Sequence, residues 1–120
     1  RGGALVTAAV EVRTPLAGLS RRDLPGRGVG PGVYTIRARV TGLVLYIGQS
    51  GDVGRRMRDY FDGGGSTRGR IHELLYGKPR FADEVEVLIE PARSPRALEQ
   101  LRLQQHRDHF GDLPPWNLRP

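Results

Sequence analysis

Two tyrosines in the first half of the chain stand in segments that alternate like β-strands. Tyr34 and Tyr46 are twelve positions apart, and an odd-length turn centred on Val40 would pair them across two strands on one face, whereas an even-length turn would separate them. Facing tyrosines on a half-buried sheet often serve packing alone. Phenols that lie near an arginine can also help to clamp a phosphate, so the pair is a candidate for chemistry.

Three arginines follow the second tyrosine within about one helical turn. Arg55, Arg56 and Arg58 carry like charges that repel one another unless an anion or an acid lies nearby. Neighbouring aspartates can supply part of that charge, which would make the segment an ordinary solvated helix face: Asp52, Asp59 and Asp62. Helical spacing also places Arg56 and Tyr60 on one face, and an arginine beside a phenol can clamp a phosphate.

A carboxylate in the last predicted helix has an unusual setting. Glu99 lies on one helical stripe with Leu103 and Phe110, so we expect it to lean against apolar neighbours. A carboxylate there costs free energy unless it is paired or binds a metal ion. Pairing with Arg96 or Arg102, three residues away on either side, is the plain alternative to a metal site.

The elements that position these side chains are predicted in the order hairpin, helix, helix, strand and helix. The expected strands are residues 32–38, 43–48 and 83–91, and the expected helices are residues 53–61, 66–77 and 95–110. The fold class is therefore α+β, with a small three-stranded antiparallel sheet flanked by helices. Residues 1–31 are expected to form a loop-rich N-terminal extension with one strand near its start, and residues 32–120 the functional domain.

Composition narrows the class of partner. The chain has 19 Lys plus Arg against 13 Asp plus Glu, a net charge of +6, which favours a polyanion such as nucleic acid. Every one of these cations except Lys78 is arginine, whose planar fork suits phosphate. There is no cysteine, so disulfides and thiolate metal sites are excluded. The apolar run near the start is too short to span a bilayer, so no membrane partner is expected.

Taken together, these motifs resemble the GIY-YIG endonuclease superfamily. The resemblance rests on Gly32-Val33-Tyr34, on Tyr46-Ile47-Gly48, and on Arg56, Tyr60, Glu99 and Asn117 in that order. It covers residues 32–117, and the stretch LYIGQSGDVGRRMRDYF looks most like the N-terminal incision domain of the bacterial nucleotide-excision-repair nuclease. Three positions depart from common family patterns: Val33 replaces isoleucine, Gln49 a lysine common in the repair branch, and Tyr60 a histidine found in many members.

The resemblance implies the GIY-YIG fold and a metal-dependent endonuclease that hydrolyses phosphodiester bonds of DNA. Glu99 would hold a single divalent ion, Mg²⁺ or Mn²⁺, and Arg56 would stabilise charge on the same phosphate. Tyr34 would orient or deprotonate the attacking water, helped by a pKa that the metal and the arginine lower. Tyr46 and Tyr60 would position water and phosphate oxygens.

A second group of residues is expected to contact the nucleic acid: Gln49, Arg55, Arg58, Arg68, Arg70 and Asn117. For Asn117 the alternative is that it fixes the last segment of the chain. DNA is the expected substrate, and RNA is the alternative. The rival to an enzyme is a nucleic-acid-binding module that keeps the basic face without turnover.

The biological setting has two interpretations. The only methionine is Met57, so we expect the chain to be part of a longer protein. A nuclease domain behind a Gly- and Pro-rich start suits the C-terminal DNase toxin domain of a secreted interbacterial effector, which would act in the cytoplasm of a target cell and require an immunity protein. The alternative is a fragment of a DNA-repair or restriction nuclease, although the repair branch carries this domain at the N-terminus.

Overall fold

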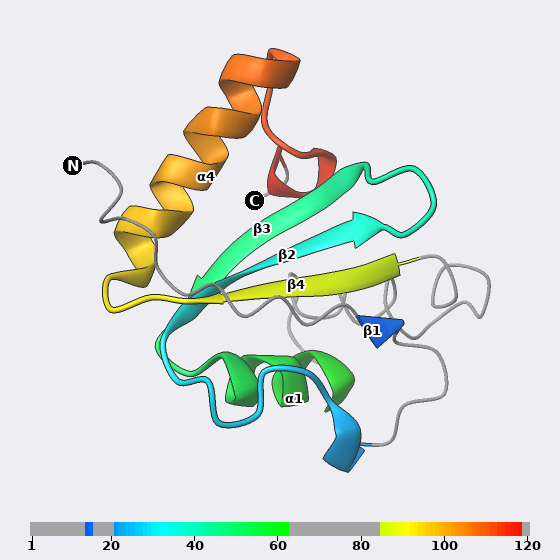
Figure 1. Ribbon diagram of the computed structural model, residues 1–120, viewed down its shortest axis with the longest axis vertical. Helices are drawn as coiled ribbons and strands as arrows, with labels where there is room; N and C mark the ends of the chain where they lie inside the picture. The colour runs from blue at the N-terminus through cyan, green and yellow to red at the C-terminus, as the bar shows by residue number, and fades with distance from the viewer. Residues whose placement is uncertain (1–13, 16–20, 63–84, 119–120) are drawn as a thin grey trace.

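The structure, a computed structural model, describes residues 14–15, 21–62 and 85–118 (Figure 1). Its strands are β1 (Thr14–Pro15), β2 (Gly32–Ala38), β3 (Val44–Ser50) and β4 (Val85–Pro91). The α-helices are α1 (Val53–Asp62) and α4 (Pro95–Phe110), and the short 3-10 helices are η2 (Arg21–Asp23) and η4 (Pro115–Leu118). The predicted helix at 66–77 lies outside the described residues. No helix among the described residues is long and apolar enough to cross a membrane.

The strands form one antiparallel sheet in the order β1-β4-β2-β3. The three long strands are β4, β2 and β3, which confirms the predicted α+β class with a small three-stranded antiparallel sheet. β1 belongs to the predicted N-terminal extension, and its two residues pair with β4 at Thr14↔Val87 and Pro15↔Glu86. Within the described sheet, β3 is therefore the edge strand on the side opposite β1.

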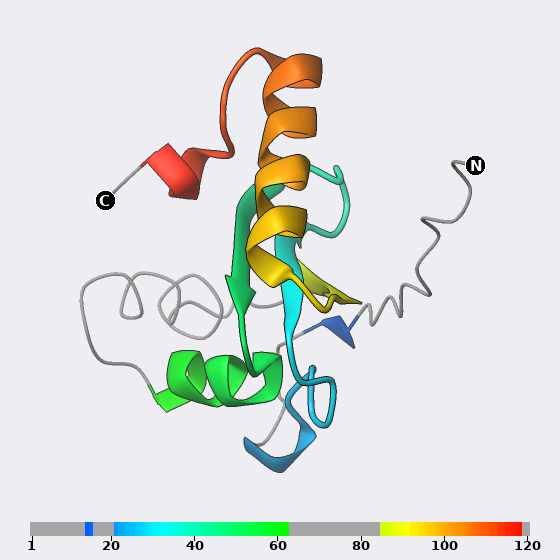
Figure 2. The same cartoon turned by 90° about the vertical axis from the view of Figure 1, so that its left-hand side faces the viewer.

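The two faces of this sheet have different helical partners. Register and alternation place Tyr34 and Ile36 on the same face as their β4 neighbours. This face packs against α1 in a core whose buried members are Leu24, Tyr34, Ile36, Val53, Met57, Tyr60, Val85, Val87 and Ile89. On the other face, the Arg102 guanidinium of α4 donates to both carboxylate oxygens of Glu90, at 2.9 and 2.6 Å. Figure 2 shows α1 and α4 toward different ends of the strands.

Residues 21–31 take part in the core, although their prolines and glycines predict loop. Leu24 is only 7 % exposed and packs in the core cluster. The backbone of this segment accepts two hydrogen bonds, from Val53 N–H to Gly30 O at 2.9 Å and from Ala92 N–H to Pro31 O at 3.0 Å. The segment therefore holds the start of α1 and the end of β4, so the packed domain extends N-terminal to Gly32.

The register of the hairpin differs from the predicted one. Tyr34 pairs with Gly48, and Tyr46 pairs with Ile36, so the direct pairing that an odd-length turn centred on Val40 would give is not observed, and the two tyrosines are offset by two residues. An irregularity between Ile36 and Arg37 shifts the pairing near the turn, because Leu45 has no partner in the ladder. A shift of two residues keeps every side chain on its face, so both tyrosines still lie on the face covered by α1.

Local sequence signals fix the ends of both α-helices. The Asp52 side chain caps α1, since its Oδ1 accepts the Arg55 N–H at 3.1 Å. α4 starts at Pro95, which is suited to the first helical turn. It ends at Gly111, which has a φ of 85° and donates its N–H to Arg107 O at 2.8 Å. The observed bounds lie within one residue of the predicted ones.

Candidate active site

Three tyrosines from β2, β3 and α1 meet on the α1 face of the sheet. The ring centroid of Tyr34 lies 6.1 Å from that of Tyr46 and 5.8 Å from that of Tyr60, the latter in an edge-on arrangement. The hydroxyls of Tyr34 and Tyr60 share a hydrogen bond of 2.5 Å. Gly48 makes this cluster possible, because a Cβ there would lie 2.5 Å from the Tyr34 hydroxyl oxygen and 2.8 Å from Tyr46 Cε2.

Burial separates the roles that these phenols can take. Tyr34 and Tyr60 are 0 % and 1 % exposed, whereas Tyr46 is half-buried. Burial raises the pKa of Tyr34 well above its ordinary value, and the neighbouring phenols Tyr60 and Tyr46 raise it further. Arg56 acts in the opposite direction, but it does not outweigh the loss of solvation. Arg56 thus lowers the pKa of Tyr34, as expected, but burial and the neighbouring phenols keep this pKa raised, and the lowering expected from a bound metal ion stays a prediction.

Tyr46, the phenol nearest to solvent, also has a raised pKa. Burial raises the pKa of Tyr46 to about 12, and the charge and hydrogen bonding of Tyr60 add to the effect. A further contribution comes from the negative charge of Glu99. Tyr46 is therefore a hydrogen-bond donor at neutral pH, and it lies within electrostatic reach of a carboxylate on α4.

Arg56 lies beside the phenols, as its helical spacing from Tyr60 predicts. Burial opposes its charge, but charge interactions and hydrogen bonding with the hydroxyls of Tyr34 and Tyr60 outweigh burial, and the pKa of Arg56 is raised. The guanidinium is therefore a permanent cation at the tyrosine cluster. It is the one group of this cluster that carries positive charge among the described residues.

Glu99 makes no hydrogen bond or salt bridge with any residue that the structure describes, and of its two expected partners only Arg96 acts on it, through its charge. Arg102, one of its two expected partners, binds Glu90 instead. Burial raises the pKa of the Glu99 carboxyl, while the charge of Arg96 lowers it. The predicted apolar stripe is only partly covered, since Phe110 is 62 % exposed. The carboxylate is thus partly desolvated and makes no ion pair among the described residues. Its negative charge acts on the hydroxyl of Tyr46.

The chemistry of Glu99 fits one hard divalent cation. Mg²⁺ is commonly held by one or two carboxylates, with water and substrate phosphates completing its shell. Among residues 14–15, 21–62 and 85–118, no group of three or more His, Cys, Asp or Glu could hold a metal ion. As far as residues 14–15, 21–62 and 85–118 are concerned, a cation at Glu99 would have phosphate oxygens and water as its other ligands.

Asn117 ties the last segment to the edge strand β3. Its Oδ1 accepts the Ile47 N–H at 2.9 Å, and its Nδ2 donates to Ile47 O at 2.8 Å. The neighbouring Trp116 packs against the core cluster. Of the two predicted roles for Asn117, fixing the last segment is the one that these contacts show, and contact with nucleic acid stays a prediction.

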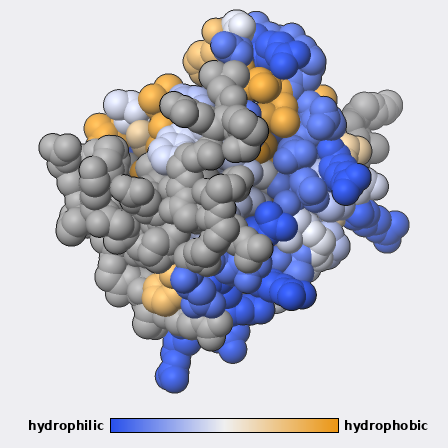
Figure 3. Space-filling model, turned by 180° about the vertical axis from the view of Figure 1, so that it is seen from behind, coloured by the Kyte–Doolittle hydropathy of each residue, from blue (hydrophilic) through white to orange (hydrophobic). Residues whose placement is uncertain are grey.

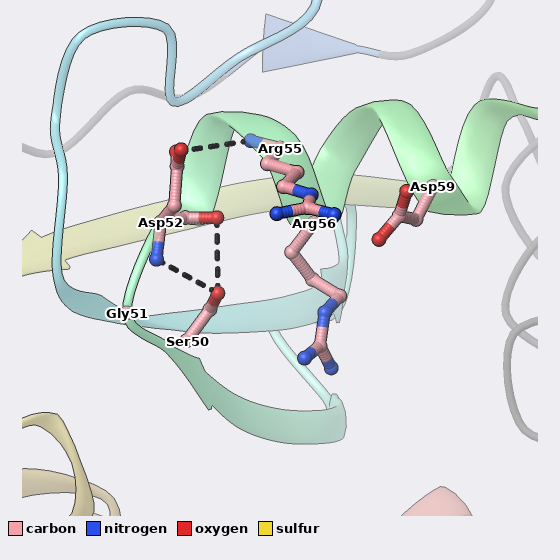
Figure 4. Close-up of a pocket in the computed structure, with 6 residues that line it drawn as sticks. All are labelled: Ser50, Gly51, Asp52, Arg55, Arg56 and Asp59. Carbon is pink, nitrogen blue, oxygen red and sulfur yellow. Dashed lines mark hydrogen bonds between the residues drawn. The ribbon is translucent and has the colours of Figure 1, made fainter.

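An open pocket adjoins the tyrosine cluster at the turn between β3 and α1 (Figure 4). Its volume is ≈ 480 Å³, and it is lined by Ser50, Gly51, Asp52, Arg55, Arg56 and Asp59. Arg56 belongs to both the pocket and the cluster. Ser50 and Gly51 were not singled out from the sequence, and Asp59 was named only as an acid that could offset the charge of the arginines. The Ser-Gly-Asp turn directly before an arginine-rich helix is the sequence signal that could have indicated this pocket.

The other predicted contact residues are spread more widely. Gln49 is half-buried on β3 and pairs with Val33, which places it on the face opposite Tyr34. Arg58 is half-buried on α1 and does not line the pocket. Arg68 and Arg70 lie outside the described residues.

The candidate active site thus consists of Tyr34, Tyr46, Tyr60, Arg56 and Glu99, which come from β2, β3, α1 and α4. All five were predicted from the sequence. No protein-family model, curated protein or solved structure matches the chain. The geometry and chemistry of these side chains are therefore the grounds for a function.

Proposed function

We propose that the chain is a metal-dependent endonuclease that hydrolyses phosphodiester bonds of DNA. The observation that carries this proposal is the meeting of three phenols and one guanidinium from three elements of the fold, with a carboxylate of α4 within electrostatic reach of Tyr46. These are the positions to which the resemblance to GIY-YIG endonucleases assigns catalysis. Packing does not explain them, because a partly buried arginine and carboxylate both cost solvation free energy.

Tyr46 is the phenol suited to touch the substrate, because it is the least buried of the three. With a pKa of about 12 it keeps its proton at neutral pH, so it donates a hydrogen bond to water or to a phosphate oxygen. Tyr34 and Tyr60 form the buried layer behind it and hold Arg56 through their hydroxyls. This arrangement favours a positioning role for Tyr34 over that of a general base.

Arg56 and Glu99 supply the charges that phosphodiester hydrolysis needs. As the water oxygen attacks phosphorus and the bond to the leaving alcohol breaks, negative charge builds on the phosphate oxygens, and Arg56 stabilises it. Glu99 would hold Mg²⁺ or Mn²⁺. Such an ion, when bound, would neutralise phosphate charge and make a water molecule more acidic.

The surface around the site suits a polyanion. Arg55 at the pocket and Arg93 and Arg96 near the start of α4 are exposed. Figure 3 shows hydrophilic side chains over much of the described part of the molecule seen from behind. Together with the net charge of +6, these arginines support nucleic acid as the partner.

The test is nicking of supercoiled plasmid by the wild type and by Glu99→Gln, each with Mg²⁺ and with EDTA. Asp108→Asn is the matched control, because Asp108 is an exposed acid on the same helix that bonds only to Gln104 among the described residues. We expect the wild type and Asp108→Asn to cut with Mg²⁺ alone, and Glu99→Gln to lose about 100-fold or more in rate. Cleavage that survives EDTA or Glu99→Gln contradicts the proposal.

The rival function is a nucleic-acid-binding module without turnover. One observation favours it: the Tyr34 hydroxyl is buried and bonded to Tyr60, so it does not face solvent. Plasmid that is bound but never cut, with Mg²⁺ and with Mn²⁺, would support this module. A parallel assay on labelled RNA decides whether RNA is the true substrate.

A further inference from the structure

The pocket at the β3–α1 turn is placed to hold the nucleotide next to the reacting phosphate. Arg56 lines this pocket and also interacts with the hydroxyls of Tyr34 and Tyr60. A phosphate bound at Arg56 would therefore have the pocket as its immediate neighbour. The volume of ≈ 480 Å³ lies in the range of small-ligand pockets, so a nucleobase can enter it.

The charges in the pocket suit a base better than a second phosphate. Two arginines and two aspartates line it: Arg55, Arg56, Asp52 and Asp59. A phosphate there would face two carboxylates at close range, which is unfavourable. The edge of a base offers hydrogen-bond donors and acceptors side by side, so it can use groups of both kinds.

Two groups in the pocket are available for such contacts. The guanidinium of Arg55 makes no hydrogen bond or ion pair with any residue that the structure describes. Oδ1 of Asp52 caps α1, and its second carboxylate oxygen has no partner among the described residues. The Ser50 hydroxyl, by contrast, is engaged, because it donates to Asp52 O at 2.9 Å and accepts from Asp52 N–H at 3.0 Å.

We infer that this pocket reads a guanine beside the phosphate that is cleaved, with Arg55 and Asp52 as the specificity residues. The arginine fork matches the two adjacent acceptors O6 and N7, which among the bases only guanine presents. The carboxylate accepts a hydrogen bond from N1–H or N2–H of an unpaired guanine, or from N4–H of the cytosine paired with it. The position of this pocket beside the cleaved phosphate rests on the proposed function, whereas recognition of the base is testable without cleavage.

The test measures binding of short DNA by the Glu99→Gln protein, in EDTA, with fluorescent oligonucleotides that differ only in one central base. Single strands and duplexes are titrated separately to distinguish unpaired from paired guanine. We expect about 5-fold or tighter binding to the guanine-containing member. Replacing that guanine by 7-deazaguanine, which lacks the N7 acceptor, should remove most of the preference.

Two conservative variants distinguish an effect on recognition of the base from an effect on folding or on net positive charge. Asp52→Asn keeps a side-chain oxygen to cap α1 and replaces the free acceptor by a donor. Arg55→Lys keeps the charge and loses the fork. We expect each variant to bind the DNA without the central guanine with nearly the affinity of its parent, while the additional affinity for the guanine-containing DNA is lost. Arg107→Lys, on the exposed last turn of α4, is the control that should keep the preference.

The outcomes distinguish this inference from the proposed function. Tight binding without base preference, or a preference that both pocket variants retain, overturns the guanine pocket and leaves the nuclease proposal standing. A guanine preference in a protein that never cuts plasmid supports the pocket and overturns the nuclease. Absence of any DNA binding overturns both.

Discussion

Gly48 is the cross-strand partner of Tyr34, and the space that its missing side chain leaves is filled by the Tyr34 ring. A Cβ at Gly48 would stand 2.5 Å from both Cζ and the hydroxyl oxygen of Tyr34, a separation that real carbon atoms do not tolerate. The glycine of the second motif is therefore a requirement of packing, and the geometry of the candidate active site depends on it.

Gly48→Ala should lower the free energy of unfolding by about 1–3 kcal/mol, because both Tyr34 and Tyr46 must move. The measurement is urea denaturation of the two proteins. Gly51→Ala is the matched control, since a Cβ there meets nothing within 4 Å, and it should change stability by less than about 0.5 kcal/mol. In a Tyr34→Ala background, Gly48→Ala should change the free energy of unfolding very little. If it lowers this free energy as much as in the wild type, the new methyl group does not contact the Tyr34 ring.

Glu99→Gln should leave the protein at least as stable as the wild type at pH 7. Burial raises the pKa of Glu99, so the folded state holds that proton more strongly than the unfolded state does. Stability from this group is therefore present below the unfolded value of 4.5 and is lost as pH rises through the folded pKa. The gain is expected to be small, below about 1 kcal/mol, because solvent screens a partly exposed carboxylate.

The check is the difference in urea midpoint between Glu99→Gln and the wild type, followed from pH 7 to pH 4.5. The difference should shrink as the pH falls, since the wild-type carboxyl becomes neutral. A variant that is clearly less stable than the wild type at pH 7 would mean that Glu99 is held by a favourable ion pair.

Alkaline pH should destabilise the protein partly through Tyr46. Its pKa of about 12 lies above the ordinary value of 10.0, so the unfolded chain loses this proton first and stability falls as pH rises from 10 toward 12. Tyr46→Phe removes that contribution, expected to be about 1–2 kcal/mol after allowance for solvent screening. Denaturation at several pH values between 9 and 12 measures it. Parallel stability curves for the two proteins would contradict a raised pKa at Tyr46.

Asn117→Asp should cost about 1–3 kcal/mol of unfolding free energy at pH 7. The acid can still accept the Ile47 N–H, but it has no proton to give to Ile47 O, so two acceptors face each other. Acidification toward pH 4 should recover part of the loss, because a protonated carboxyl can donate. Gln100→Glu, an amide-to-acid change at an exposed position on α4, should stay within about 0.5 kcal/mol. Equal effects at both positions would show that Asn117 anchors nothing.

The elements of this fold could be predicted because their signals are local. Strand alternation, the Asp52 cap and Pro95 each act within a few residues, and the observed strands and helices follow them closely. The hairpin register could not be predicted, because the unpaired Leu45 adds a residue to one strand, which the spacing of Tyr34 and Tyr46 does not reveal.

The members of the candidate active site were found from the sequence, but their environments were not. Spacing placed Arg56 beside Tyr60, whereas the burial of Tyr34 depends on how α1 lies on the sheet. Arg102 was an equal candidate for Glu99 by helical spacing, yet it binds Glu90, a strand residue that only the tertiary fold brings near. The residue types in the sequence therefore indicate which reaction the site could catalyse, whereas the pKa values of its side chains depend on contacts between residues that are distant in the sequence.

The side-chain amide of Asn117 forms hydrogen bonds with the outward-facing N–H and C=O of Ile47, which lies in the middle of an edge strand. Open strand edges are where a neighbouring molecule can add a strand of its own, which is a common route to aggregation. One amide from the end of the described chain fills that position by imitating the two hydrogen bonds of a paired strand. The same contact that anchors the last segment thus also works as a barrier against association of the sheet with other chains.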